Sequence, residues 1–391
     1  MRLLRQNKKV NLTNIYTHIY IYIKNTYSRR KIIISGSEKI YTMKKNNLKL
    51  YIFVIISYCY VINAEIGCQD EDGSSVDWWA AIKYPDGTTY AYADANSDSF
   101  KLSSNDMKYK TTGALSETLQ QVYKGSSKTV GYAMYNDESP NGDKFGTAWG
   151  HFKGVVATDK SNGFWLIHSA PRFPETVANG YDGYPDFASK YGQSFLCTSL
   201  DADTINTVGI QMQMARGHIY DANVPSFVND TMPDFADAIG GKHVTSGDFT
   251  SVKTITTRGG ASFTSFMKAG KWDKELYEYL VAPTLGAGVY AETWQNGVGA
   301  TPSFCNTSYS YNALNINELV MPDGTSWTNS RDHSKWCCTM DRGIKVACIG
   351  GINRQHGQFG RGGGTLCFQD NENMWESMYN MVKEVKPCAD K

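Results

Sequence analysis

The residues best suited to chemistry form two short motifs with the same spacing. One residue separates His151 from Lys153, and one residue separates His333 from Lys335. When the two stretches are laid together without a gap, further pairs coincide: Asp159 with Asp341, Lys160 with Arg342, Ile167 with Ile349 and Arg172 with Arg354. This repetition predicts two structurally similar halves, each of which contributes one His and one Lys.

Two such pairs provide the groups needed for phosphoryl transfer without a metal ion. One imidazole attacks phosphorus, the other protonates the leaving oxygen, and two ammonium groups stabilise the phosphate charge. In a strand, residues two apart share a face, so the His and Lys of each motif can reach one anion. We take His151 as the nucleophile and His333 as the acid, although a symmetric pair does not distinguish these roles. Taken alone, either motif is better explained by an ordinary histidine with an unrelated lysine nearby.

Other polar residues at matching offsets have two possible functions. Asp159 and Asp341 can orient the imidazoles, but their turn-like surroundings slightly favour a turn-forming role. His168 and Asn353 lie near the ends of the two repeats and are candidates for binding phosphate oxygens, while a structural role fits His168 equally well. The glycine-rich segment 361–365 can cradle phosphate through its N–H groups, although such runs are more often plain turns.

The formal net charge of +1 hides a strong asymmetry along the chain. Residues 1–64 contain 12 of the 39 Lys and Arg but one of the 38 Asp and Glu. The remaining chain therefore carries 27 basic and 37 acidic residues, a net charge of −10 with neutral His. Binding of a polyanion through bulk charge is excluded, so DNA as a partner requires a local positive site or an acidic pH.

The segment 43–64 is typical of a secretory signal peptide. Three lysines, at positions 44, 45 and 49, precede the apolar run 50–62, and Ala64 offers a cleavage site before Glu65. The apolar run is shorter than the roughly 20 residues that span a bilayer, so no membrane anchor is expected after cleavage. We predict that residues 1–42 are a non-functional extension and that the mature chain is secreted or lysosomal.

Cysteine usage agrees with export. Of nine cysteines, Cys59 lies in the predicted signal peptide, and the other eight form no C-x-x-C pair. An even number in an exported chain predicts disulfides rather than a zinc site. No metal-binding motif and no G-x-S-x-G motif occurs, so neither a metal, another cofactor nor a serine nucleophile is expected. The sequons at Asn229 and Asn306 predict glycosylation.

The secondary-structure patterns predict a mixed fold. Strands are expected at 76–84 and 129–136, and hairpins at 154–158 with 163–168 and at 335–339 with 344–349. Helical patterns cover 115–123, 262–280 and 373–385. Strands interleaved with helices predict an α/β or α+β fold, with one half at 65–220 and the other at 221–391.

Several stretches closely resemble the deoxyribonuclease II family over about residues 66–390. They include the segments around the two motifs, 150–155 and 332–337, and the segments 163–174, 351–354 and 361–367. Gly67 and Cys68, followed by the segment 76–79, resemble the mature N-terminus of that family. The resemblance implies an acid endonuclease that works without metal and leaves 3′-phosphate ends.

The resemblance also implies a fold similar to phospholipase D. Two pseudo-symmetric α/β halves would then hold the active site between them. Each Asp here lies one residue farther from its Lys than in the phospholipase D pattern, which leaves the orienting roles open. By position, the implied disulfides are Cys68–Cys197, Cys305–Cys388 and Cys348–Cys367. The pairing of Cys337 and Cys338 is not implied.

The predicted function is hydrolysis of DNA by a metal-independent acid endodeoxyribonuclease through a phosphohistidine intermediate. One alternative is a secreted protein of the same fold that has lost turnover and serves as a binding or host-modulating factor. A second is a phosphodiesterase that acts on a lipid. The preference between DNA and RNA and the oligomeric state are not determined by the sequence.

Overall fold

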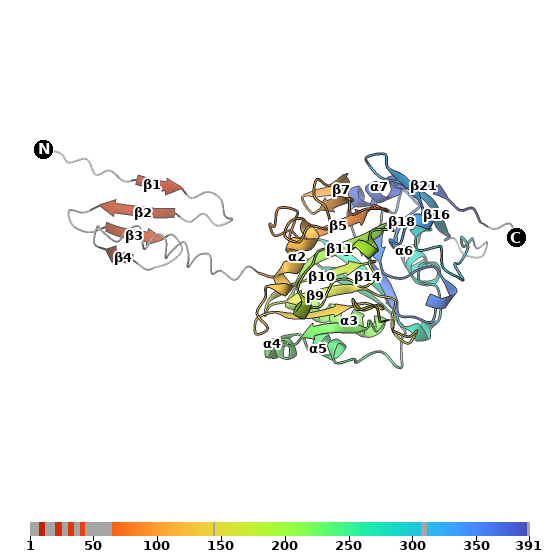
Figure 1. Cartoon of the computed structure of the whole chain (residues 1–391), viewed down its shortest axis with the longest axis horizontal. Coiled ribbons are helices and arrows are strands. Elements are labelled where there is room, and N and C mark those ends of the chain that lie inside the picture. Colours follow the sequence, from red (N-terminus) through yellow and green to blue (C-terminus); the bar gives the residue numbers. More distant parts are fainter. Residues whose placement is uncertain are drawn as a thin grey trace. The chain divides into compact units, whose positions relative to one another are not determined.

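The computed structural model describes residues 8–11, 20–25, 30–34, 40–43, 65–143, 145–305 and 311–388. The chain forms two units, Met1–Ala64 and Glu65–Lys391 (Figure 1). In the first unit, four strands form an antiparallel sheet in chain order: β1 (Lys8–Asn11), β2 (Tyr20–Asn25), β3 (Arg30–Ile34) and β4 (Ile40–Met43). Residues 44–64, most of the predicted signal peptide, lie outside the described residues.

The second unit contains two large sheets. The first has the order β12-β8-β9-β10-β11-β5-β6-β7 and is antiparallel throughout. Its strands are β5 (Trp78–Lys83), β6 (Tyr90–Asp94), β7 (Ser97–Leu102), β8 (Gly131–Tyr135), β9 (Gly154–Thr158), β10 (Asn162–His168), β11 (Gln193–Asp201) and β12 (Ile219–Asn223).

The second sheet has the order β13-β14-β20-β19-β18-β15-β16-β17, and β21 also pairs with β16. Its strands are β13 (Thr250–Thr256), β14 (Ser262–Lys268), β15 (Val289–Glu292), β16 (Ala313–Val320), β17 (Ser326–Thr328), β18 (Trp336–Thr339), β19 (Ala347–Gly350), β20 (Gly363–Phe368) and β21 (Val382–Val385). The pair β15–β16 is parallel.

The two sheets repeat one strand pattern. The run β8-β9-β10-β11-β5 in the first sheet matches β15-β18-β19-β20-β14 in the second. Each His-x-Lys motif directly precedes the second strand of its run, β9 or β18. Each motif therefore lies just before a strand. The expectation that the His and Lys of a motif lie within a strand is wrong.

Helices are few. They are α2 (Ala114–Tyr123), α3 (Ala202–Ala215), α4 (Ser226–Thr231), α5 (Pro233–Ile239), α6 (Ala282–Leu285) and α7 (Glu372–Asn380), with a π-helical turn at Tyr277–Val281 just before α6. Single 3₁₀ turns occur at Val177–Asn179, Asp186–Ala188, Gly270–Trp272, Asn329–Arg331 and His356–Gln358. With two sheets and few helices, the architecture is α+β and is consistent with a phospholipase D-like fold.

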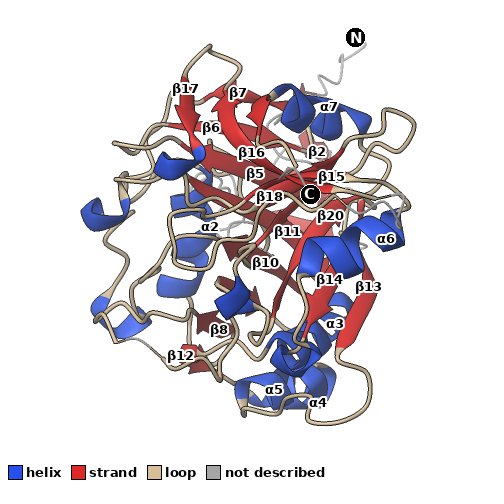
Figure 2. Cartoon of the chain, turned by 90° about the vertical axis from the view of Figure 1, so that its right-hand side faces the viewer, coloured by secondary structure: helices blue, strands red, loops and turns tan. Residues whose placement is uncertain are grey.

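The main hydrophobic core lies between the two sheets. Trp78 of β5 contacts Phe368 of β20 edge to face, with ring centroids 5.0 Å apart, and both are buried in the same cluster. Helices α3 and α7 pack into this cluster, and α4 and α5 lie beyond α3 at one end of the second unit (Figure 2). A second cluster joins α2 to the first sheet, and a third joins the π-helical turn to the second. Burial of both faces explains why central strands such as β5, β8 and β9 are mostly apolar, whereas the edge strands β7, β13 and β21 contain exposed polar residues.

Most of the predicted elements are confirmed, but one helix is wrong. The segment 262–280 begins with strand β14, which pairs with β13 on one side and β20 on the other. Gly260 adopts a φ of +95° in the turn that joins β13 to β14, so a hairpin forms there. The pattern 373–385 is helical only through Asn380, and β21 follows. Helix α3 was not predicted, although Asp201 caps it by accepting from the Thr204 N–H at 2.8 Å.

The described residues form three disulfides, Cys68–Cys197, Cys305–Cys388 and Cys348–Cys367, which are the pairs that the family resemblance implied. The third joins the neighbouring strands β19 and β20. Cys337 and Cys338 are free and buried in β18. In the described part of the chain, no helix combines the length and apolar character that a membrane crossing requires.

Candidate active site

His151 is held rigidly at the entry to β9. Its backbone N–H donates to the carbonyl of Gly362 at 2.9 Å, and its side chain is 92% buried, with 8% exposed. The ring Nδ1 lies 2.6 Å from the carbonyl oxygen of Gly351. Because a carbonyl oxygen only accepts, Nδ1 carries the proton, and Nε2 of the neutral ring keeps its lone pair.

His333 is fixed in the same manner by different groups. Its Nδ1 lies 3.1 Å from Oε1 of Gln193, the first residue of β11. The Ser169 hydroxyl donates to the same oxygen, so Oε1 acts as an acceptor and Nδ1 of His333 is again the protonated nitrogen. The indole of Trp294 meets the imidazole edge to face, with centroids 5.3 Å apart.

Each histidine is therefore oriented by the opposite half of the molecule. Gly351, which binds His151, lies just after β19 in the second sheet, whereas Gln193, which binds His333, lies in the first. Charges of His151 and Lys153 shift the pKa of His333, and the charge of Lys335 shifts that of His151. Gly350, next to Gly351, also donates its N–H to the carbonyl of Lys335 at 2.8 Å, so the two motifs meet at one place between the halves.

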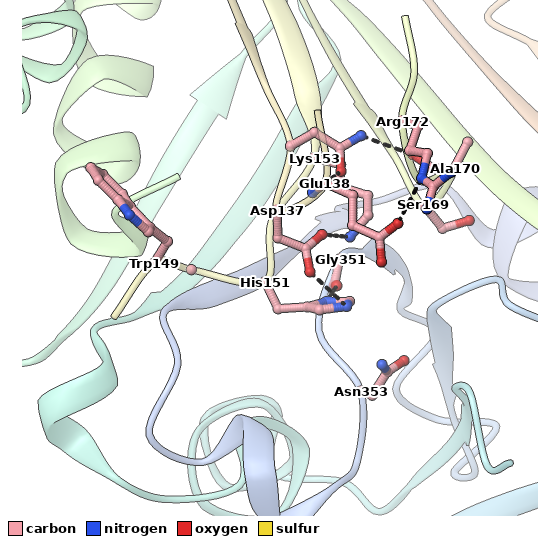
Figure 3. A network of polar contacts seen from close by, with 12 residues as sticks. Asp137, Glu138, Trp149, His151, Lys153, Ser169, Ala170, Arg172, Gly351 and Asn353 are labelled. Atoms are coloured by element: carbon pink, nitrogen blue, oxygen red, sulfur yellow. Dashed lines mark hydrogen bonds and ion pairs between the residues drawn. The ribbon is translucent and has the colours of Figure 1, made fainter. Parts of the chain in front are cut away.

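A buried ionic cluster surrounds His151. The carboxylate of Asp137 pairs with Lys153 through Oδ1, while Oδ2 lies 3.3 Å from Arg361 and 3.8 Å from Nε2 of His151. Figure 3 shows Asp137 between Lys153 and His151, with the Trp149 ring turned away from this group. Burial alone would raise the pKa of Asp137, but Lys153, His151 and Arg361 hold it well below its ordinary value. Asp137 is therefore ionised.

Lys335 has a different environment. It is fully buried, and its Nζ donates to the carbonyl of His333. Among the described residues, no carboxylate lies within salt-bridge distance of it. Burial, followed by repulsion from Lys153, lowers the pKa of Lys335 well below its ordinary value. An incoming phosphate would raise that pKa again, because it brings negative charge to a buried amine.

Both histidines have lowered pKa values for a common reason. Burial is the largest cause, and it is followed by repulsion from Lys153 at His151 and from Lys335 at His333. Asp137 opposes the shift at both rings. Neutral imidazoles with free Nε2 lone pairs are the form a nucleophile requires, while a general acid must gain a proton together with the substrate.

The other predicted ligands differ in position. Asn353 accepts from the backbone N–H of Trp294 at 3.2 Å and so supports the ring that packs on His333. His168 is fully buried between the rings of Phe173 and Phe195, and neither of its nitrogens makes a hydrogen bond of good geometry to a described residue, although the nearby Ala170 backbone raises its pKa. Burial and Lys153 lower its pKa to about 3. Its surroundings are those of a core residue.

Asp159 and Asp341 do not reach the imidazoles. Asp159 lies in the β9–β10 turn, where its carboxylate accepts from Ser161 and Asn162, at the far end of β9 from His151. Asp341 likewise accepts from Gly343 in the turn after β18. A carboxylate that accepts from backbone N–H groups of the residues just after it forms an Asx turn. The carboxylate beside His151 is Asp137 instead.

The glycine-rich segment packs against protein rather than around an anion. A Cβ at Gly362 would lie 2.0 Å from the carbonyl oxygen of Ala215, and one at Gly363 would lie 3.0 Å from that of His151. The glycines thus let β20 start against the end of α3 and beside His151. Arg361, immediately before them, supplies the side chain that reaches Asp137.

Three residues of the site were not predicted from the sequence. Asp137 lies two residues after β8, at the end of the sheet where His151 precedes the neighbouring strand β9. Its position just after a strand was the signal available in the sequence. Gln193 starts β11 and Trp294 follows β15, and only the tertiary fold brings them to His333.

The remaining predicted sites are peripheral. Asn229 is exposed on α4, which is compatible with a glycan, whereas Asn306 lies outside the described residues. Among the described residues, no group of three or more His, Cys, Asp or Glu side chains is arranged to hold a metal ion.

Comparisons with known proteins place this site in context. A deoxyribonuclease II family model matches residues 67–388. Plancitoxin-1 of Acanthaster planci is 34% identical over 337 residues, which cover 83% of this chain and 93% of that protein. Deoxyribonuclease-2-alpha of Mus musculus is 32% identical and covers 83% of this chain and 94% of its own length. Deoxyribonuclease-2 of Caenorhabditis elegans is 32% identical, and the match covers 87% of this chain and 98% of that protein.

Proposed function

Since the chain belongs to the deoxyribonuclease II family, we propose that it is an acid endodeoxyribonuclease that hydrolyses DNA to 3′-phosphate ends. The observation that carries this proposal is the histidine pair. Each ring is anchored at Nδ1 by the opposite half, which leaves Nε2 of His151 and of His333 for chemistry. Anchoring of the distal nitrogen keeps a reacting imidazole in one tautomer and one orientation.

The reaction proceeds in two steps. One imidazole attacks the phosphorus and forms a phosphohistidine linked to the 3′ oxygen of the DNA, while the other protonates the departing 5′ oxygen. Water, deprotonated by the second imidazole, then releases a 3′-phosphate. Lys153, Lys335 and Arg361 stabilise the charge on the phosphorane, since all three surround the two rings. No step requires a metal ion.

An acidic working pH follows from the same environment. Burial and neighbouring cations lower the pKa of both histidines, so the imidazole that donates a proton is protonated more easily as the pH falls. A secreted or lysosomal location, reached after removal of residues up to Ala64, fits this requirement. Mass spectrometry of the exported protein tests the processing: an N-terminus at or near Glu65 is expected, and retention of residues 1–42 would refute it.

A nicking assay tests the activity itself. Protein that begins at Glu65 is incubated with supercoiled plasmid at pH 5 in excess chelator, and the relaxed form is quantified. Nicking by the wild type and none by His333→Ala is the expected result. No nicking by the folded wild-type protein would favour a binding protein that has lost turnover.

A further inference from the structure

The two halves differ at one pair of equivalent positions beside the histidines. Tyr135 of β8 pairs with Gly154, the first residue after the first motif, and Glu292 of β15 pairs with Trp336, the first after the second. Asp137 lies two residues after Tyr135 in the first half, and Trp294 lies two residues after Glu292 in the second. The pseudo-symmetric site therefore places a carboxylate beside one imidazole and an indole beside the other.

The carboxylate acts on the reactive nitrogen of His151. Oδ2 of Asp137 lies 3.8 Å from Nε2, on the side of the ring opposite the Gly351 hydrogen bond. The side chain is held in place by Lys153 and Arg361. An ionised carboxylate at this distance stabilises an N–H at Nε2, in opposition to burial, Lys153 and Arg361, which lower the pKa of His151.

His333 lacks such a partner within the described structure. The adjacent Asp332 uses Oδ1 to accept from the Ser334 N–H at 2.6 Å and Oδ2 to accept from the Trp327 indole at 2.7 Å. Glu292, at the end of β15, is fully buried and hydrogen-bonds through neither carboxylate oxygen to a described residue. Burial, followed by repulsion from Asp332, raises its pKa well above the ordinary value. The carboxylate that raises the pKa of His333 is again Asp137, as the smallest cause, and it lies beyond ion-pair distance of this ring.

We infer that Asp137 makes His151 the general acid and leaves His333 as the nucleophile. The assignment rests on the proposed two-histidine function and reverses the roles taken from the sequence, where the motifs could not be distinguished. Asp137 is a positioning residue in this scheme, since it acts through His151 and not on the substrate.

The bonds and protons balance as follows. The Nε2 lone pair of His333 forms a bond to phosphorus, the P–O5′ bond breaks, and the Nε2 proton of His151 moves to the O5′ oxygen. Nε2 of His151, now unprotonated, takes a proton from water, whose oxygen bonds to phosphorus as the P–N bond to His333 breaks. The products are a 5′-hydroxyl and a 3′-phosphate, and His151 again carries the proton for the next cycle.

Substrate binding adds to the difference between the two histidines. Without substrate, burial and the cations keep both imidazoles neutral near pH 7, since their pKa values lie well below the ordinary value. A phosphodiester brings one negative charge into the site and promotes uptake of one proton. Asp137 directs that proton to His151, because it is within 4 Å of that Nε2 and not of the other.

A substrate with an activated leaving group separates the two roles. In thymidine 3′-(4-nitrophenyl phosphate), nitrophenolate replaces the 5′ oxygen and departs without a general acid. His151→Ala should release about one equivalent of nitrophenol in a burst and then stall, because His333 is esterified and no base activates water. His333→Ala should show no burst. After an alkaline quench, which preserves phosphohistidine, peptide mass spectrometry should find the adduct on His333.

Asp137→Asn provides a second measurement that keeps the side-chain shape. Cleavage of a thymidine dinucleotide, whose alkoxide leaving group needs a proton, should fall by about 100-fold, in the range of general-acid catalysis. Cleavage of the nitrophenyl ester should fall by less than about 10-fold, because only phosphate positioning is disturbed. Equal losses on the two substrates would mean that Asp137 has a merely structural role.

The outcomes distinguish this inference from the proposed function. An adduct on His151, or a burst by His333→Ala but not by His151→Ala, overturns the role assignment while the two-histidine mechanism stands. Failure of the folded wild-type protein to cleave either substrate contradicts the proposed function instead. Wild-type protein quenched in alkali during turnover gives a check free of mutation, and its adduct should also be on His333.

Discussion

At the level of single residues, the site depends on hydrogen bonds that fix the unreactive nitrogen of each imidazole. Gly351 and Gln193 hold Nδ1 of His151 and of His333. The two rings act in the same catalytic cycle, one forming the covalent bond and the other moving the proton. Loss of either interrupts the cycle at its first step for a natural substrate.

Substitution of the histidines should therefore be strongly non-additive. His151→Ala and His333→Ala are each expected to lower the rate of DNA cleavage by at least about 1,000-fold, and the double variant should be little slower, because the residues function as a unit. Initial rates of plasmid nicking measure this. His243→Ala, at a half-buried histidine outside the site, is the matched control and should retain the wild-type rate. A tenth or more of the activity left in either single variant would argue against the two-histidine mechanism.

His168 should make the protein less stable in acid. Because burial and Lys153 lower its pKa to about 3, the unfolded chain takes up a proton below about pH 6.5, whereas the folded chain does not. Its contribution to stability is full above pH 6.5 and is lost as the pH falls toward 3, with about 2 kcal/mol lost at pH 5.

His168→Phe should consequently flatten the decline in the free energy of unfolding between pH 7 and pH 5, measured by urea denaturation. The comparison of slopes separates the titration from any change in packing between Phe173 and Phe195. His243→Phe, at a half-buried histidine outside the core, is the control for loss of a histidine elsewhere in the chain. A slope in His168→Phe equal to that of the wild type would show that His168 is not buried in its neutral form.

At the level of elements, the residues that directly precede three strands form the active site. His151 precedes β9, His333 precedes β18, and Gly362 precedes β20, so three strand entries converge. The close approach of Gly362 to the end of α3 sets the position of the carbonyl that binds the backbone of His151. Local packing is thereby coupled to the position of a reacting ring.

Gly362→Ala tests this coupling. A Cβ would lie 2.0 Å from the carbonyl oxygen of Ala215, a contact that forces β20 and α3 apart. We expect a loss of about 3 kcal/mol in the free energy of unfolding and at least a 10-fold lower rate of DNA cleavage. Gly357→Ala is the matched control, since its Cβ would meet nothing within 4 Å. Similar behaviour of the two variants in denaturation and nicking assays would contradict this account.

The same elements mark the limit of sequence-based prediction. The hairpins after both motifs and helix α2 follow from local alternation and turn residues, and both motifs were identified because they repeat. Asp137 could not be assigned, because its partners Lys153 and Arg361 meet it only in the tertiary fold. For β14, pairing on both sides overrode a local pattern that favoured a helix.

At the level of the whole molecule, charge and site environment favour activity in acid. The chain beyond Ala64 carries a formal net charge of −10, which repels DNA near neutrality. Six histidines lie in this region. The buried pair of the site gains a proton together with substrate.

DNA cleavage should therefore be at least about 10-fold faster near pH 5 than at pH 7.5. Initial nicking rates across this range at constant ionic strength provide the measurement, since salt also weakens DNA binding. A rate that does not change up to pH 7.5 would mean that the proton donor is not an imidazole with a lowered pKa, and Lys335 would then be the candidate.

The most direct measurement of the central claim is the chemistry of the ends left on DNA. A defined oligonucleotide is cleaved at pH 5 in excess EDTA by protein that begins at Glu65, and the fragments are analysed by mass spectrometry. Attack by a histidine on phosphorus with departure of the 5′ oxygen predicts 3′-phosphate and 5′-hydroxyl ends in the presence of chelator. Fragments with 5′-phosphate ends, or cleavage that appears only after a divalent metal is added, would contradict the account.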